Sequence, residues 1–332
     1  MSSPRGIKHR IEQSWMERGG LALALRPLAW LLCALVFIRR TAYRLKIFQT
    51  TTLPVPVIVI GNISVGGTGK TPLTIWLANY LAKNGYRPGI VSRGYGGKAR
   101  KWPQQVRADG DPIMVGDEAI VISRRSNCPM AVGPRRVAAA EALIKHHDID
   151  IILSDDGMQH YALGRTIEIA VIDGVRRFGN GLCLPAGPLR EPIKRLKEVD
   201  FIVTNGIAAQ AEVSMRYEGK MLNHLDDSSE KPLGSLKHET VHAIAGIGNP
   251  ERFFEQLRRA GLHLIEHVFA DHHEFSPKDL DFGDDLPIIM TEKDAVKCRR
   301  FLLSNCWYYP VTAILPDEFG LQVLNLLEKR HG

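Results

Sequence analysis

A glycine-rich segment constrains the fold of this chain more than any other feature. Residues 57–72 read VIVIGNISVGGTGKTP, a short apolar run followed by glycines and a lysine–threonine pair. A buried strand that leads through such a loop into a helix binds phosphate, because glycines let backbone N–H groups approach closely and the helix N-terminus adds positive potential. The segment departs from the pattern G-x-x-x-x-G-K-[ST] at its first position, which is Ser64. We therefore expect a nucleotide-binding phosphate loop, or P-loop, rather than an ordinary glycine turn.

The residues of this loop have separate predicted roles. Lys70 would reach the β- and γ-phosphates of ATP, and the hydroxyl of Thr71 would hold Mg²⁺. Backbone N–H groups of the glycines would surround the phosphates. The predicted nucleotide-binding residues are Ser64, Val65, Gly66, Gly67, Thr68, Gly69, Lys70 and Thr71.

Short apolar runs alternate with helical stretches after Pro56. Continuous Ile and Val runs without polar alternation are typical of strands that are buried on both faces of a parallel sheet. The predicted strands are residues 57–61, 88–92, 149–156, 167–173 and 199–205, and the predicted helices between them are 70–84, 117–125 and 134–146. This pattern predicts an α/β fold with a doubly wound, mostly parallel sheet, as in P-loop NTPases.

A polar stretch divides the chain. Residues 223–240 read NHLDDSSEKPLGSLKHET and are the expected linker or hinge. A second, smaller α/β domain is expected beyond it, with a strand at 241–248, a helix at 250–261 and a strand at 286–291. The predicted organisation is an N-terminal helical segment at 1–50, a P-loop domain at 51–222, the linker at 223–240 and the smaller domain at 241–332.

The positive charge of the chain is concentrated at its N-terminus. Residues 1–50 hold nine Lys and Arg against two Glu, which accounts for the whole net charge of +7. The remaining residues are neutral overall, so the charge pattern does not indicate a surface for nucleic acid. We therefore expect no nucleic acid among the partners.

The same region contains the most apolar stretch of the chain. Residues 21–38 are apolar except for Arg26 and Pro27, and they are followed by Arg39 and Arg40. A membrane-associated basic amphipathic helix, lying on an anionic membrane surface, is the favoured interpretation. An ordinary packed helix, a spanning segment and a secretory signal are the alternatives, although the following RRTAYRLK offers a signal peptidase no small-residue cleavage site.

Cysteine usage and composition indicate the class of protein. The five cysteines are odd in number and include no C-x-x-C pair, which argues against a disulfide framework or a structural zinc cluster. A reducing, cytoplasmic environment fits this usage. With 332 residues, 45% of them hydrophobic and 24% charged, the chain is globular rather than disordered. Nothing in the sequence indicates an oligomeric state.

A second group of Mg²⁺ ligands is expected at the end of a strand near the P-loop. Asp155 and Asp156 follow an apolar run in IDIILSDDG. Such carboxylates order the Mg²⁺ shell directly or through water. A plain Asp–Gly turn at the strand end is the structural alternative.

Transfer of a phosphoryl group to a hydroxyl also needs a base and nearby cations. The candidates for the base are Asp117 with Glu118 in VGDEA, and the cluster of Asp271, His272 and His273. A helix N-cap and a solvated turn are the alternatives for these two groups. The candidate cations are Arg93, Arg136 and Arg190, since a guanidinium can bind phosphate through two aligned bonds.

Taken together, these strings resemble the tetraacyldisaccharide 4'-kinase family, the enzymes that phosphorylate the lipid A precursor. The resemblance begins with the basic apolar N-terminus and covers nearly the whole chain. The matching strings are GNISVGGTGKTP (61–72), SRGYGG (92–97), GDEA (116–119), SDDGMQH (154–160), LPAGPLREP (184–192), GIGNPERFF (246–254), DHHEF (271–275) and TEKDAVK (291–297).

The resemblance implies a reaction and a location. The γ-phosphoryl group of ATP would pass to the 4'-hydroxyl of a tetraacylated glucosamine disaccharide 1-phosphate. This lipid A precursor stays in the bilayer, so the enzyme is expected at the cytoplasmic face of the inner membrane of a Gram-negative bacterium. The anionic surface of that membrane would be its second partner.

The resemblance also implies roles for individual residues. Asp117 would be the base, His272 would tune or orient it, and Arg136 would contact the transferring phosphates. Asp155 and Asp156 would serve Mg²⁺ and the transition state. The residues expected on the substrate side are Arg93, Tyr95, Glu118, Arg190 and Glu191, and Lys293 and Asp294 are candidates for nucleotide contacts.

A membrane-associated P-loop switch ATPase of the partitioning or cell-division type is the competing interpretation. Such ATPases carry K-G-G-x-G-K-[ST], whereas Val65 stands at the position of the signature lysine. The sequence therefore favours the kinase. In the kinase, Asp117 and His272 lie on opposite sides of the predicted hinge, so the two domains would have to close on each other.

Overall fold

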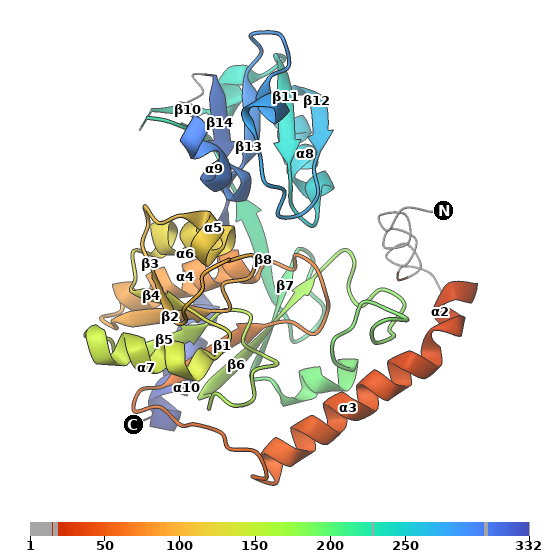
Figure 1. The fold of residues 1–332 in the computed structure, drawn as a ribbon, viewed down its shortest axis with the longest axis vertical. Coiled ribbons are helices and arrows are strands. Elements are labelled where there is room, and N and C mark those ends of the chain that lie inside the picture. The colour runs from red at the N-terminus through yellow and green to blue at the C-terminus, as the bar shows by residue number, and fades with distance from the viewer. Residues whose placement is uncertain (1–14, 16–18, 228, 302–304, 332) are drawn as a thin grey trace.

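The computed structural model describes residue 15 and residues 19–227, 229–301 and 305–331. Within these residues the strands form two sheets, each in a domain of its own (Figure 1). The larger sheet has nine strands in the order β15-β8-β7-β6-β1-β5-β2-β4-β3. The smaller sheet has six strands in the order β10-β9-β14-β13-β11-β12. The predicted α/β fold with a second, smaller α/β domain is confirmed.

The larger sheet is parallel through its centre. Its parallel strands are β1 (Val57–Gly61), β2 (Pro88–Ser92), β4 (Met130–Val132), β5 (Ile151–Ser154), β6 (Ile167–Asp173), β7 (Phe201–Asn205) and β8 (Val213–Glu218). β3 (Gln104–Val106) and β15 (Thr312–Ile314) pair antiparallel at the two edges. Every residue of β1 and β6 is buried, as their continuous apolar runs predict.

Helices cover both faces of the larger sheet. α4 (Lys70–Lys83), α6 (Asp117–Ser126) and α10 (Asp317–His331) pack on the face that contains Ile58 and Ile60. α7 (Arg136–His146) packs on the opposite face with Val57 and Val59. Neighbouring side chains of a strand point to opposite faces, so β1 contributes to both cores. This two-sided cover fixes the carboxyl ends of the parallel strands along one edge, where the P-loop lies.

The smaller sheet also combines parallel and antiparallel strands. β11 (Thr240–Ala245), β12 (His263–Val268), β13 (Ile288–Thr291) and β14 (Cys306–Tyr309) are parallel. β9 (Met221–His224) and β10 (Glu230–Pro232) add to it antiparallel. α8 (Pro250–Arg259) packs on one face through Phe253, Phe254 and Leu257, and α9 (Glu292–Cys298) packs on the other.

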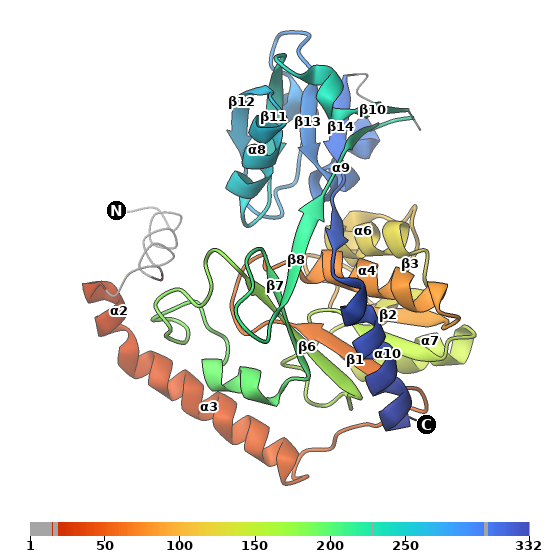
Figure 2. The same cartoon turned by 180° about the vertical axis from the view of Figure 1, so that it is seen from behind.

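The predicted domain boundaries need correction. Residues 223–240 are not a linker, because β9, β10 and the start of β11 fall within this range and belong to the smaller sheet. Their polar side chains fit a sheet edge that faces solvent. The chain instead crosses at 219–220 and returns at 310–311, where the Tyr309 hydroxyl donates to the Gly219 carbonyl at 2.8 Å. After this return, β15 and α10 pack on the P-loop domain (Figure 2).

The N-terminal segment forms two helices, α2 (Gly20–Ala24) and α3 (Arg26–Arg44), along the outside of the larger domain (Figure 1). Residues 1–14 and 16–18 of the predicted segment lie outside the described residues. α3 buries Ala29 against the protein but exposes a set of large apolar side chains: Leu28, Trp30, Leu31, Leu35, Phe37 and Ile38. Among the described residues, no helix is both long enough and apolar enough to span a bilayer.

Candidate active site

The P-loop follows β1 and ends where α4 begins at Lys70. Gly66 and Gly69 have φ angles of +94° and +106°, a backbone conformation that favours glycine. A Cβ atom at position 69 would also collide with the Tyr217 hydroxyl and lie 2.9 Å from the Asn205 amide. Within the loop, the Asn62 amide donates to the Thr68 hydroxyl at 3.2 Å. The loop is therefore held in one shape, with the first turn of α4 behind it.

Two residues from neighbouring strand ends support this shape. The Asn205 amide donates to the Thr68 carbonyl at 3.3 Å, and Arg176 Nη2 donates to the Gly67 carbonyl at 2.9 Å. Arg176 also pairs with Asp173, the last residue of β6, at 3.4 Å. Arg176 and Asp173 belong to none of the motifs described above. A signal was present, because Asp173 ends a buried strand that must reach the same edge of the sheet.

Lys70 and Asp156 face each other beside the loop. Their Nζ and Oδ1 atoms are 3.5 Å apart, and Arg190 Nη1 lies 3.2 Å from the same carboxylate oxygen. Burial raises the pKa of Asp156, but the charges of Lys70 and Arg190 outweigh burial, so its pKa lies below the ordinary value. The structure thus brings three predicted residues together.

Asp155 is in a different environment although it is the next residue. Its side chain is buried, and it accepts hydrogen bonds from Thr74 at 3.0 Å and from Ser92 at 3.3 Å. Burial, together with the charges of Glu118 and Asp156, raises the pKa of Asp155 to about 6. A cation beside Asp155 would oppose the effect of burial and stabilise the ionised carboxylate.

The donor set at this position fits Mg²⁺. Thr71 on the first turn of α4 and the carboxylates of Asp155 and Asp156 offer hard oxygen ligands. No cluster of three or more His, Cys, Asp or Glu side chains that could hold a metal exists among the described residues. That result agrees with a P-loop site, where few protein ligands share the ion with nucleotide phosphates.

Asp117 and His272 meet across the two domains. Asp117 is the first residue of α6 and is 5% exposed, and its Oδ2 lies 3.1 Å from His272 Nδ1. Its other oxygen accepts the Glu118 N–H at 2.8 Å. Burial raises the pKa of Asp117, but the hydrogen bond from His272 and the nearby lysine charges outweigh it and lower the pKa. The same hydrogen bond raises the pKa of His272.

A lysine of the smaller domain joins this pair. Lys293 Nζ lies 3.1 Å from Glu118, 3.0 Å from Asp271 and 3.5 Å from His272 Nε2. Burial disfavours its charge, but the surrounding carboxylates outweigh burial and raise its pKa. The structure therefore places Lys293 beside the Asp117–His272 pair. Its sequence neighbour Asp294 is fully buried and accepts bonds from the Gly246 N–H and the Thr291 hydroxyl, so it is a structural residue rather than a candidate for nucleotide contact.

The smaller domain also reaches the P-loop itself. A Cβ atom on Gly248 would lie 3.7 Å from the Gly67 nitrogen. Arg252 in the first turn of α8 donates to the Asn205 carbonyl at 3.4 Å. The segment 246–252 thus lies close to the phosphate loop, and the Asp117–His272 contact joins the two domains that Figure 1 shows.

The remaining predicted residues fall into three environments. Arg136 is 3% exposed and donates to the carbonyls of Gly133 at 2.9 Å and Asp156 at 3.5 Å; burial lowers its pKa to about 10. Arg93 and Tyr95 are exposed at the rim, where the Tyr95 ring lies 5.0 Å from the His272 ring. Glu191 is fully buried beneath the site.

Glu191 differs from the expectation for a substrate contact. Its carboxylate accepts hydrogen bonds from Gln159 at 2.8 Å and from the Tyr161 hydroxyl at 2.6 Å. Arg40 of α3 lies 3.8 Å away. These contacts connect α3 to the segment that carries Arg190, so the structure gives Glu191 a packing role.

Known proteins with similar sequences share one description. The family model for tetraacyldisaccharide-1-P 4'-kinase matches residues 21–328. The tetraacyldisaccharide 4'-kinase of Nitrosococcus oceani is 55% identical over 315 residues, which cover 95% of this chain and 93% of that protein. The enzyme of the same name from Alkalilimnicola ehrlichii is 52% identical over 304 residues, covering 90% and 91% of the two chains.

A solved structure is also similar over most of the chain. It is LpxK from Aquifex aeolicus, determined in complex with ATP. The two chains are 26% identical and superpose with a TM-score of 0.78 over 92% of this chain and 99% of the other. The similarity therefore includes both domains.

Proposed function

The chain belongs to the tetraacyldisaccharide-1-P 4'-kinase family, and we propose from this premise how its residues transfer a phosphoryl group from ATP to the lipid A precursor. The enzyme is a kinase of lipid A biosynthesis. Its acceptor is the 4'-hydroxyl of tetraacyldisaccharide 1-phosphate. One observation carries the proposal: the Asp117–His272 contact lies between the two domains, beside a P-loop whose lysine faces a pair of carboxylates.

The P-loop binds and orients the triphosphate. Backbone N–H groups of the glycines and the first turn of α4 surround the phosphate oxygens. In the absence of nucleotide, the Lys70 ammonium contacts Asp156 at this edge of the sheet. When ATP binds, Lys70 would leave this contact and bind the β- and γ-phosphates. Arg176 keeps the loop in shape through the Gly67 carbonyl.

The end of β5 and the start of α4 offer oxygen ligands for Mg²⁺. The Thr71 hydroxyl and the carboxylates of Asp155 and Asp156 would hold it. When bound, the ion neutralises charge on the phosphates during transfer. Burial and the nearby carboxylates Glu118 and Asp156, which disfavour the ionised form of Asp155, support this position for a cation.

Asp117 accepts the proton of the acceptor hydroxyl. The hydroxyl oxygen attacks the γ-phosphorus, the bond from phosphorus to the bridging oxygen breaks, and ADP leaves. His272 holds the carboxylate in one orientation, and Lys293 fixes His272 and Glu118 in turn. Because His272 and Lys293 belong to the smaller domain, the base is fully positioned only when the domains are closed.

Three arginines and a tyrosine complete the site. Arg136 and Arg190 both lie at Asp156, where they would stabilise charge on the transferring group. Arg93 and Tyr95 are exposed at the rim beside His272, where a sugar phosphate can reach them. These residues are the proposed contacts to the disaccharide.

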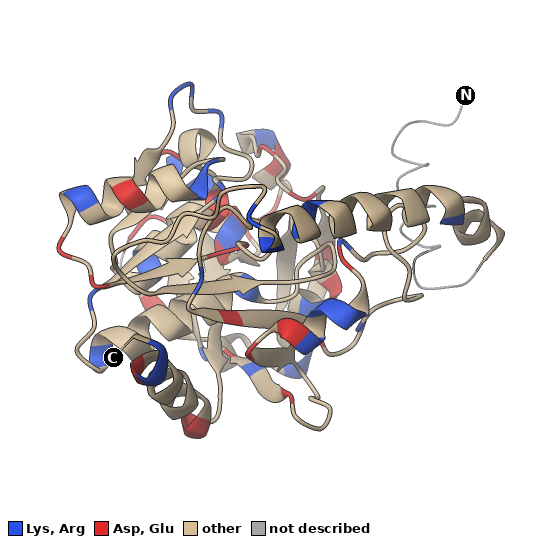
Figure 3. Cartoon of the chain, turned by 90° about the horizontal axis from the view of Figure 1, so that it is seen from below, with Lys and Arg blue, Asp and Glu red and all other residues tan. Residues whose placement is uncertain are grey.

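The N-terminal helices place the enzyme on the membrane. The exposed apolar side chains of α3 would enter the interface of the inner membrane at its cytoplasmic face, and the basic residues at the end of α3 would face anionic lipids. Seen from below, Lys and Arg of α3 gather mainly near the end that meets the larger domain (Figure 3). The acceptor carries four acyl chains, so this location brings the site to its substrate.

Transfer of labelled phosphate tests the function. The purified full-length chain is incubated with γ-labelled ATP and Mg²⁺, with and without detergent-solubilised tetraacyldisaccharide 1-phosphate. We expect label in the lipid only when the acceptor is present. Label that appears solely as inorganic phosphate, whether or not acceptor is added, would favour the switch ATPase and contradict the kinase.

A further inference from the structure

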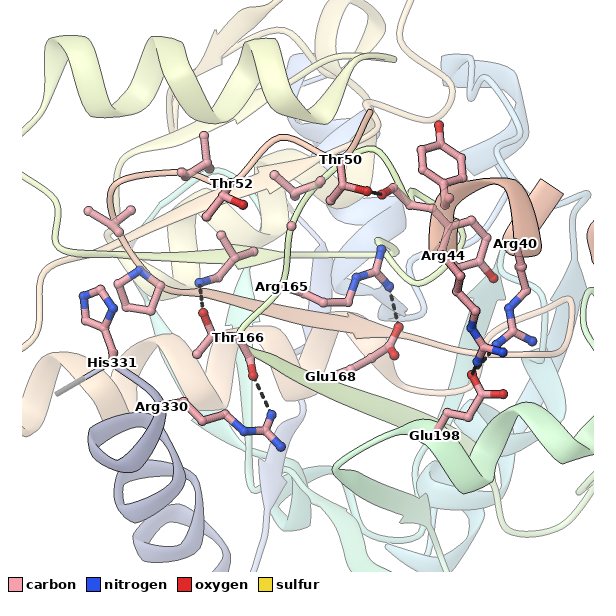
Figure 4. Close-up of a pocket in the computed structure, with 18 of the residues that line it drawn as sticks. Arg40, Arg44, Thr50, Thr52, Arg165, Thr166, Glu168, Glu198, Arg330 and His331 are labelled. Atoms are coloured by element: carbon pink, nitrogen blue, oxygen red, sulfur yellow. Dashed lines mark hydrogen bonds and ion pairs between the residues drawn. The ribbon is translucent and has the colours of Figure 1, made fainter. Parts of the chain in front are cut away.

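A cavity of about 580 Å³ lies at the opposite end of the larger sheet from the P-loop. It is enclosed by the end of α3, the segment 50–57 that leads into β1, the segment 161–168 before and within β6, and the end of α10 (Figure 4). β1 separates it from the P-loop. At about 3.3 Å per residue, the five residues of this strand span roughly 16 Å.

The described lining of this cavity is rich in arginine. It includes Arg40 and Arg44 from α3, Arg165, Arg195, and Arg330 from α10. Four carboxylates lie beside these five guanidinium groups: Glu168 and Glu198 in the lining, Glu191 beside Arg40 and Arg195, and Asp200 at 2.6 Å from Arg330. Guanidinium groups still outnumber carboxylates, which favours an anion.

Arg195 is the least satisfied of these groups. Its side chain is 4% exposed, and it pairs with Glu168 through Nη2. Among the described residues, its Nε and Nη1 atoms are buried without a hydrogen-bond partner, although Glu191 and Glu198 lie at 3.6 Å and 3.9 Å. A buried guanidinium nitrogen without a hydrogen bond is costly, so an acceptor introduced beside Arg195 would be stabilising.

The Glu198 carboxylate occupies the position in this cavity where an external anion would bind. Its carboxylate pairs with both Arg40 and Arg44, the latter at 2.6 Å (Figure 4). The Glu198 side chain is 37% exposed, so an external anion could approach the same guanidinium groups from solvent. A phosphate group has such geometry, because guanidinium groups bind phosphate and carboxylate oxygens in the same way.

Apolar side chains adjoin the arginines. Leu45, Ile47 and Phe48 follow α3 directly and are 67%, 69% and 49% exposed. They continue the exposed apolar surface of α3. A ligand that fits both features has an anionic head and an apolar tail.

We propose that this cavity binds the phosphate group of an anionic membrane phospholipid, whose acyl chains lie along the end of α3. The site is separate from the proposed reaction, because it lies at the amino ends of the strands, but it rests on the proposed contact between α3 and the membrane. Its role is to fix the orientation of the larger domain on the bilayer.

Binding to vesicles tests the proposal. The full-length protein is mixed with vesicles of phosphatidylcholine alone and with vesicles that contain phosphatidylglycerol. Arg44→Gln and Arg330→Gln should each reduce the phosphatidylglycerol-dependent part of binding about fivefold. Arg39→Gln is the matched control, because Arg39 lies on the same helix and outside the lining. If Arg39→Gln lost as much phosphatidylglycerol-dependent binding as the other two variants, general surface charge would explain the binding. That result would overturn the proposed site.

Glu198→Gln gives a change of the opposite sign. Removing this carboxylate frees Arg40 and Arg44, so we expect tighter binding to phosphatidylglycerol vesicles and no change on phosphatidylcholine. A purely structural ion pair would instead lower thermal stability without any gain in lipid binding. Weaker binding in both Glu198→Gln and Arg44→Gln would contradict the proposal.

Two further experiments identify the source of the phosphate group that the cavity binds. Inorganic phosphate at millimolar concentration should not displace the protein from phosphatidylglycerol vesicles, whereas full displacement would assign the cavity to a free anion. In neutral detergent micelles, Arg44→Gln should leave KM for tetraacyldisaccharide 1-phosphate unchanged. A raised KM there would assign the cavity to the substrate and overturn the proposal. Absence of kinase activity in wild type would instead count against the proposed function, because vesicle binding is measured without turnover.

Discussion

The two ends of the nine-stranded sheet compensate charge in different ways. At the carboxyl end, burial and the charges of Glu118 and Asp156 raise the pKa of Asp155 to about 6, although Lys70 opposes this shift. At the amino end, guanidinium groups outnumber carboxylates, and two buried nitrogens of Arg195 lack hydrogen bonds to the described residues. One end therefore suits a cation and a nucleotide, and the other suits an anionic headgroup. The same sheet thus separates the chemistry from the membrane contact.

Lys70→Ala should have the largest effect and should be confined to the carboxyl end. Loss of the ammonium removes charge stabilisation of the transferring phosphates, so kcat should fall about 100- to 1,000-fold at saturating acceptor. Binding to phosphatidylglycerol vesicles should not change. Lys83→Ala, at the exposed end of the same helix, is the control. Retained turnover in Lys70→Ala would remove the P-loop from the mechanism.

Lys293→Ala should affect the contact between domains. The substitution leaves Glu118 and Asp271 without this cation and releases His272, so kcat should fall roughly tenfold. Lys278→Ala, an exposed lysine of the smaller domain, should behave as wild type. Steady-state kinetics with both substrates varied provide the measurement, and a change in KM for ATP alone would show that Lys293 binds nucleotide instead.

Phe37→Ser should act on membrane association and leave the chemistry intact. Phe37 is 66% exposed on α3, and removing its ring should lower partitioning to vesicles about fivefold. Leu321→Ser, an equally apolar exposed position on α10, is the control. If partitioning is unaffected, the exposed face of α3 does not enter the bilayer.

His272→Ala should shift the pH dependence with a smaller change in rate at neutral pH. Its hydrogen bond lowers the pKa of Asp117, so without it the carboxylate takes up a proton at higher pH. On acidification, kcat/KM of the variant should therefore begin to fall at a higher pH than kcat/KM of the wild type. In the wild type, Asp117 stays ionised to a lower pH. An unchanged acid limb would indicate that another group titrates.

The carboxyl end of the sheet could be predicted because its residues follow a local pattern. The strand, the glycines and Lys70 are consecutive, and Asp155 with Asp156 ends another apolar run. Asp117 and His272 were paired by resemblance to a family, and the structure brings them to 3.1 Å. Arg176 could not be predicted, because an arginine three residues beyond a strand has no motif of its own.

The domain boundary and the amino end could not be predicted in the same way. β9 and β10 are polar because they lie at an edge of the smaller sheet, and hydrophobic patterning does not report which sheet a strand joins. The arginines of the cavity come from α3, the loop before β6, the 3-10 helix Ile193–Glu198 and α10, which are up to about 290 residues apart in sequence. Only the fold brings them together.

A structure of the full-length enzyme with a non-hydrolysable ATP analogue and Mg²⁺ tests the central claim most directly. We predict that the γ-phosphate lies at Lys70, and that the Asp117 carboxylate faces the γ-phosphorus with room for one hydroxyl oxygen between them. His272 should still contact Asp117. A triphosphate bound away from Gly66–Lys70, or an Asp117 carboxylate turned away from the γ-phosphorus, would contradict the account.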